Sequence, residues 1–99
     1  MITVKFFESE HRLSGFEMQG HALFSEHGTD IVCAAASSAA IMAANTITEV
    51  LEEAVEIQTD EGYLLLKGVQ SEASQGVLEG LKLHIAQLVE QYPAHITLS

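Results

Sequence analysis

An uncharged, alanine-rich stretch of eighteen residues, Ile31 to Thr48, lies near the middle of this chain of 99 residues. Its length approaches that of a membrane span, but six of its residues are serine, threonine, asparagine or cysteine, so we predict a buried helix and no membrane partner. Such a helix must be covered on most sides. We expect it to run from Asp30 or Ile31 to about Glu53, with Thr29 or Asp30 as its N-cap, against a sheet on one face and a second subunit on another.

Two hairpins are predicted, one on each side of this helix in the sequence. The first joins apolar, alternating segments at 2–7 and 15–20 through a polar connection. The second joins 56–59 to 63–67 through Asp60, Glu61 and Gly62, a sequence typical of a tight turn. The segment Leu23 to Thr29 has no clear period, and we interpret it as a loop with Gly28 as its hinge.

A second helix is predicted from Ser71 to Gln91, because leucine and isoleucine recur there at helical spacing. Ser71 or Ser74 can cap its start, Pro93 prevents its continuation, and residues 95–98 alternate as a terminal strand. The predicted order is β-β-α-β-β-α-β in a single domain, residues 1–99. We therefore expect an α+β two-layer sandwich with two helices packed on one largely antiparallel sheet.

Fourteen acidic and four basic residues give a formal net charge of −10, which argues against direct nucleic-acid binding because phosphate contacts need clustered lysine and arginine. An acidic surface attracts a basic protein partner, although the same charge equally serves solubility. A single cysteine cannot form an internal disulfide, and residues 1–5 lack the pattern of a signal peptide. These features favour a reducing, cytoplasmic location.

That cysteine, Cys33, is predicted in the first turn of the uncharged helix, with His21 upstream. A helix N-terminus and a nearby imidazole both favour the thiolate, the form of cysteine that attacks carbonyl groups. His21 would then be the general base and Cys33 the nucleophile, with the amides around Ala34 as an oxyanion hole. Asp30 is a candidate to orient His21, although an N-cap role suits it better. Ser37 is a candidate to line the pocket or to hydrogen-bond to His21, but it could equally bond back to its own helix.

Two other interpretations compete with catalysis. Single cysteines are often inert, buried apolar residues. A metal site is the second alternative, but the spacing of the possible ligands fits no zinc pattern and a second cysteine is absent, so we predict neither metal nor cofactor. The possible ligands are His21, His27, Asp30 and Cys33.

The residues around the histidine and the cysteine resemble a known signature. Gly20-His21-Ala22, followed by Gly28, Asp30-Ile31-Val32-Cys33-Ala34-Ala35 and Ser37, is similar to the motif of the ribosomal-processing cysteine protease family called Prp. The similarity extends over essentially the whole chain.

This resemblance implies a cytoplasmic, homodimeric endopeptidase that removes an N-terminal extension from a basic bacterial large-subunit ribosomal protein, bL-twenty-seven. It implies Cys33 as the nucleophile, His21 as the general base, and a hydrophobic groove beside Cys33 for the residues that precede the cut. The loop 23–29 would move to admit the peptide. The alternative is a non-catalytic dimeric module that binds a ribosomal protein or an assembly intermediate without turnover.

Overall fold

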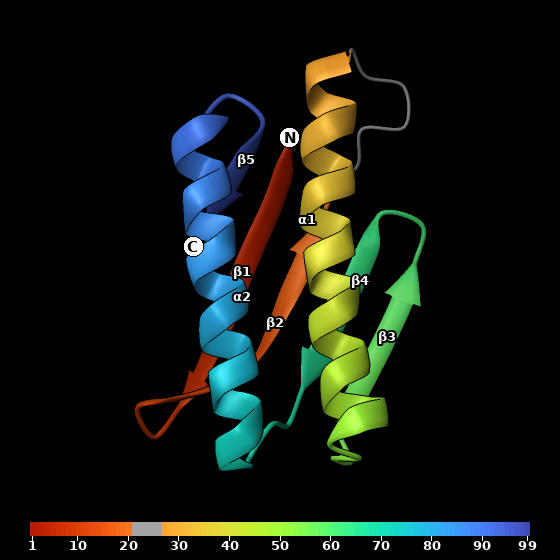
Figure 1. Cartoon of the computed structure of the whole chain (residues 1–99), viewed down its shortest axis with the longest axis vertical. Coiled ribbons are helices and arrows are strands. Elements are labelled where there is room, and N and C mark those ends of the chain that lie inside the picture. Colours follow the sequence, from red (N-terminus) through yellow and green to blue (C-terminus); the bar gives the residue numbers. More distant parts are fainter. Residues whose placement is uncertain (21–26) are drawn as a thin grey trace.

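The computed structural model describes residues 1–20 and 27–99 and has the predicted order of elements, with two helices on one face of a five-stranded sheet (Figure 1). The strands are β1 (Ile2–Ser9), β2 (Arg12–Gln19), β3 (Glu56–Asp60), β4 (Tyr63–Lys67) and β5 (Ile96–Leu98). The helices are α1 (His27–Asn45), which continues as a π-helical turn η1 (Thr46–Val50), and α2 (Glu72–Gln91). The expected α+β sandwich is confirmed.

The sheet has the strand order β3-β4-β2-β1-β5. Its pairs are antiparallel except for β1 and β5, which run parallel. Alternate side chains of β1, β2 and β4 point toward the helices and form the core, because one face of an antiparallel sheet is buried while the other meets solvent. The core strand residues include Ile2, Val4, Phe16, Leu64 and Leu66.

The inner face of α1 closes this core with small side chains, as its composition predicts. Val32 and Ala36 are fully buried, as are Ala40 and Ala43 farther along the same face. The stretch Ile31–Val50 is long and apolar enough to cross a membrane by length and composition alone, and 33% of an 18-residue window within it is buried inside this structure. Its outer face carries exposed apolar residues, among them Ile41 and Met42.

Three boundaries differ from the predicted ones. The helix α1 begins at His27, so Gly28, Thr29 and Asp30 lie within its first turn. Neither Thr29 nor Asp30 is therefore its N-cap, and the predicted loop does not extend to Thr29. The helical stretch ends at Val50 instead of Glu53.

The first hairpin is also tighter than predicted. Both strands extend toward each other until only Glu10 and His11 connect them, with φ values of 54° and 67°. Two consecutive residues with positive φ are the conformation of a type I′ hairpin turn.

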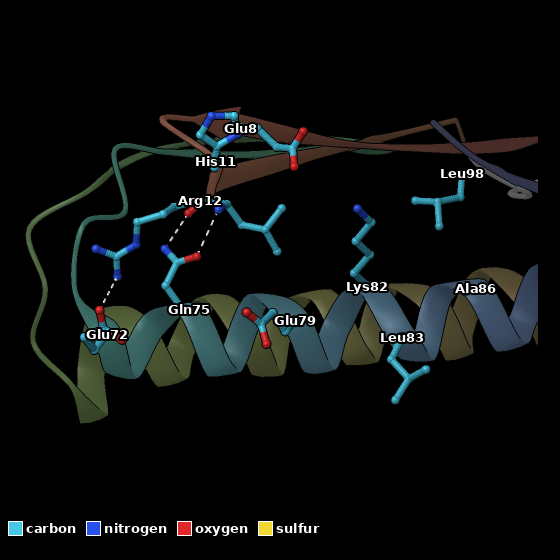
Figure 2. Close-up of a pocket in the computed structure, with 11 residues that line it drawn as sticks. Glu8, His11, Arg12, Glu72, Gln75, Glu79, Lys82, Leu83, Ala86 and Leu98 are labelled. Carbon is cyan, nitrogen blue, oxygen red and sulfur yellow. Dashed lines mark hydrogen bonds and ion pairs between the residues drawn. The ribbon is translucent and has the colours of Figure 1, made fainter.

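Side chains of α2 hold the first hairpin against the helix layer (Figure 2). The Gln75 side chain accepts a hydrogen bond from the Leu13 amide at 2.9 Å and donates one to the Leu13 carbonyl at 2.5 Å. Arg12 forms an ion pair with Glu72 at 2.9 Å. Of these, the buried Gln75 bonds contribute more to stability, because an exposed ion pair is worth little.

Glu53 joins the end of the first helical stretch to the start of α2. Its carboxylate accepts hydrogen bonds from the Ser71 hydroxyl at 2.7 Å, the Ser74 hydroxyl at 2.6 Å, and the amides of Gln70 and Ser71 at 2.6 and 3.1 Å. Ser71 is the N-cap of α2, since its hydroxyl accepts from the Ser74 amide. Partial burial alone would raise the pKa of Glu53, but these four bonds outweigh it and lower the pKa to about 2.

We expect Glu53→Gln to destabilise the fold by about 2 kcal/mol at pH 7, because a neutral amide replaces a partly exposed carboxylate that accepts four bonds. A carboxyl whose folded pKa is depressed stabilises the fold above its unfolded pKa, which is 4.5 for Glu53, and this contribution is lost as the pH falls toward 2. The difference between the two proteins in urea unfolding should therefore shrink below pH 4.5. Glu90→Gln, at an exposed position of α2, is the control. A difference that stays constant from pH 7 to pH 3 would contradict this assignment.

Candidate active site

Cys33 lies on α1 where that helix faces the ends of β2 and β4. It is the seventh residue of the helix and is partly exposed. A cavity of about 340 Å³ opens beside it. Among the described residues, three segments line this cavity: α1 with Cys33, Ser37 and Ile41; the end of β2 with Met18 and Gly20; and the β3–β4 hairpin with Thr59, Asp60, Gly62, Tyr63 and Leu64.

Gly20 connects two of these segments. Its amide donates to the Gly62 carbonyl at 3.1 Å, which ties the end of β2 to the β3–β4 turn. Gly20 has a φ of 98°, and a Cβ placed on it would overlap the Met1 carbonyl oxygen. Only glycine adopts this positive φ readily and also lacks the Cβ that would overlap the carbonyl oxygen. Gly20, the residue that precedes the candidate base His21 in the sequence, is therefore held in a fixed position.

Ser37 is a hydrogen-bond partner of the Cys33 thiol. Its hydroxyl lies 3.9 Å from the Cys33 sulfur, one helical turn farther along α1. The spacing of four residues places both side chains on one face of the helix. Ser37 is one of the residues of α1 that line the cavity beside Cys33.

The helix start changes the electrostatic argument for Cys33. Only the first four amide N–H groups of a helix lack an intrahelical acceptor, and Cys33 and Ala34 are the seventh and eighth residues of α1. The two amides therefore belong to the interior of this helix, and the predicted oxyanion hole from them is not formed in it. The prediction that Cys33 lies in the first turn of the helix is wrong for the same reason.

The remaining predicted site residues are placed only in part. His21 lies outside the described residues, as do Leu23 and the rest of 21–26. Gly28 and Asp30 belong to the first turn of α1, and the side chain of Ala34 is exposed beside Cys33. Among the side chains that the structure describes, those of residues 1–20 and 31–99, no group of three or more His, Cys, Asp and Glu is arranged to hold a metal ion.

The β3–β4 hairpin is the part of the site that the sequence did not indicate. Its turn was predicted, but its position beside Cys33 depends on the pairing of β2 with β4. Tyr63 in this hairpin donates a hydrogen bond from its hydroxyl to Glu17 at 2.7 Å, and this bond raises the pKa of Tyr63. The bond joins β4 to β2 and helps to hold the hairpin against that strand.

The chain is similar to known proteins over nearly its whole length. The family model described as "Cysteine protease Prp" matches residues 1–97. The ribosomal processing cysteine protease Prp of Bacillus subtilis (strain 168) is 28% identical over 92 residues, which cover 85% of this chain and 82% of that protein. The protein of the same name from Staphylococcus aureus (strain NCTC 8325 / PS 47) is 30% identical over 104 residues, covering 100% of this chain and 98% of the relative.

Solved structures extend the similarity to the fold. The S. aureus ribosomal processing protease Prp in complex with a substrate peptide superimposes with a TM-score of 0.90 at 29% identity, covering 100% of this chain and 98% of that chain. The same enzyme with a covalently linked product peptide has a TM-score of 0.86 at 30% identity, with the same coverage.

Proposed function

The chain belongs to the Prp family of ribosomal processing cysteine proteases, and from this membership we propose that it removes the N-terminal extension of a large-subunit ribosomal protein, bL-twenty-seven. The observation that carries the proposal is the cavity beside Cys33, which combines a partly exposed thiol with apolar walls from Met18, Ile41 and Leu64. A peptide segment with apolar side chains suits such walls. The relatives with substrate and product peptides support a peptide as the molecule that enters.

In the proposed reaction, His21 takes the proton from the Cys33 sulfur and the thiolate attacks the scissile carbonyl. The C–N bond breaks as the His21 imidazolium protonates the leaving amine, which leaves an acyl group on sulfur as a thioester. Water, deprotonated by His21, then attacks the thioester, releases the carboxylate product and returns the thiol. The complete reaction consumes one water molecule and needs no cofactor.

The other predicted residues have supporting roles in this proposal. Ser37 contacts the sulfur and positions the thiol for attack. Asp30 precedes Cys33 by three residues on α1, which puts the two positions on one side of the helix, and we assign it to orienting His21. Ala34 keeps the approach to the sulfur open with a small side chain. Gly28 lies in the first turn of α1 and not in a loop, so we assign it no hinge role.

The proposal is tested with a synthetic peptide that spans the extension and the first residues of the mature ribosomal protein of the same organism. We expect one cleavage, located by mass spectrometry. Family membership favours this outcome over the non-catalytic module, which would bind the peptide without turnover. Tight binding with no product after prolonged incubation would favour the module instead.

A homodimer is the second part of the proposal, and the outer face of α1 supports it. Ile41 and Met42 are 53% and 61% exposed, and Val50 at the end of the same stretch is 72% exposed. No charged side chain lies between Ile31 and Thr48 to solvate this face. Ile41 also lines the Cys33 cavity, so a partner on this face would extend the cavity wall.

We expect Met42→Glu to convert the dimer to a monomer, because a carboxylate would be buried at the centre of the apolar contact. Analytical ultracentrifugation at micromolar concentration measures this. Leu83→Glu, at a similarly exposed position of α2, is the matched control and should leave the dimer intact. A monomeric wild-type protein, or dissociation by both variants alike, would exclude this interface.

A further inference from the structure

The cavity beside Cys33 has one charged residue among the described residues that line it. Met18, Ile41 and Leu64 are apolar, and the other lining residues are neutral. Asp60, the last residue of β3, is the exception. A carboxylate beside a mostly apolar cavity can favour a positively charged ligand group, which the apolar residues cannot do.

Asp60 is held in place by its turn. Its carboxylate accepts a hydrogen bond from the Glu61 amide at 2.7 Å through one oxygen, Oδ1. Gly62, with a φ of 69°, completes the turn and accepts the hydrogen bond from Gly20 that anchors it to β2. One hydrogen bond thus orients the carboxylate of Asp60, an exposed residue, on a turn that is itself anchored to β2. The carboxylate has capacity for further hydrogen bonds because an ionised carboxylate has about four acceptor positions.

We propose that Asp60 is a specificity-determining residue that binds a lysine or arginine side chain of the substrate next to the scissile bond. This inference rests on the proposed function and concerns which peptides the same site selects. The net charge of −10 attracts any basic chain to the surface, but a diffuse field does not select a sequence position. A single carboxylate in the cavity wall selects one position, because the cation must lie at a fixed distance along the peptide from the carbonyl that meets Cys33.

The test uses a series of peptides that share one cleavable sequence and differ in a single lysine, placed in turn at each of three positions on either side of the scissile bond. A lysine-free peptide with glutamine is the reference. We expect the wild-type protein to prefer lysine at one position, with KM about fivefold lower than for glutamine there, the upper range for a partly exposed ion pair. In Asp60→Asn this ratio should fall to about one. The asparagine keeps an oxygen acceptor for the Glu61 amide, so the turn is preserved.

Glu61→Gln is the matched control, because it removes the same charge from the adjacent residue, which does not line the cavity. It should keep the fivefold preference. Asp60→Lys should reverse the preference toward a peptide with glutamate at the selected position. A preference that survives in Asp60→Asn, or one lost equally in Glu61→Gln, would overturn the assignment and indicate diffuse attraction.

Binding to the Cys33→Ala protein separates this inference from the proposed function. Fluorescence anisotropy with labelled lysine and glutamine peptides measures the same preference as a ratio of Kd values without turnover. Cleavage of the lysine-free peptide with no positional preference would refute only the role of Asp60. If the wild-type protein cleaves no peptide, the proposed function fails, and the Kd ratio alone decides whether Asp60 recognises a cation.

Discussion

Replacement of Cys33 by alanine should reduce peptide cleavage at least about 10³-fold, because no other group in the proposed mechanism can form the acyl intermediate. The change is small in volume, and Cys33 only borders the core, so the fold should persist. Steady-state cleavage of the extension peptide, followed by mass spectrometry, measures the loss. Circular dichroism and the thermal midpoint of the variant show that the loss is chemical.

A histidine pair tests the base in the same assay. His21→Ala should lower kcat by about 10² to 10⁴, the usual contribution of general acid–base catalysis. His84→Ala, at an exposed position of α2, removes the same side chain elsewhere and should leave cleavage unchanged. Cleavage that persists in the Cys33→Ala protein would refute the nucleophile, whereas equal effects of the two histidine variants would refute His21 as the base.

Regular elements were predictable here because each has a strong local period. The core face of α2 repeats Leu78, Leu81, Ile85 and Leu88 at helical spacing, and all four are buried. Turns and ends were less predictable. Gly28, Thr29 and Asp30 favour loops and caps locally, yet they lie within α1. Glu10 and His11 form a turn with positive φ although they lack the asparagine or glycine that usually indicates it.

In the candidate site, too, local features were predictable and long-range ones were not. The contact between Cys33 and Ser37 follows from a spacing of four residues on a helix, which the sequence shows directly. The position of Asp60 and Gly62 beside Cys33 could not be predicted from the sequence. It depends on the register of β2 against β4 and on the hydrogen bond from Gly20 to Gly62. Those partners are about forty residues apart in the sequence, and no local pattern encodes the pairing.

Gly15→Ala, at the one glycine within the described strands of the sheet, should strongly destabilise the fold. Gly15 lies in β2 opposite Phe7 of β1 and Lys67 of β4. A Cβ built there overlaps the carbonyl oxygen of Leu66, a residue that is fully buried. A backbone group in the middle of a sheet cannot move away as a flexible side chain can, so we expect a cost of about 3 kcal/mol. For a domain of this size, that lowers the thermal midpoint by about 15 °C.

Gly68→Ala separates this overlap from backbone strain. Gly68 has a φ of 90°, but a Cβ there has open space within 4 Å, whereas Gly15 is not among the glycines with positive φ. Gly68→Ala should therefore cost about 1 to 2 kcal/mol through conformation alone. Differential scanning calorimetry of both variants gives the two values. If Gly15→Ala proves no worse than Gly68→Ala, β2 and β4 can separate locally, and the pairing that places Asp60 beside Cys33 is then less rigid than the register of the sheet implies.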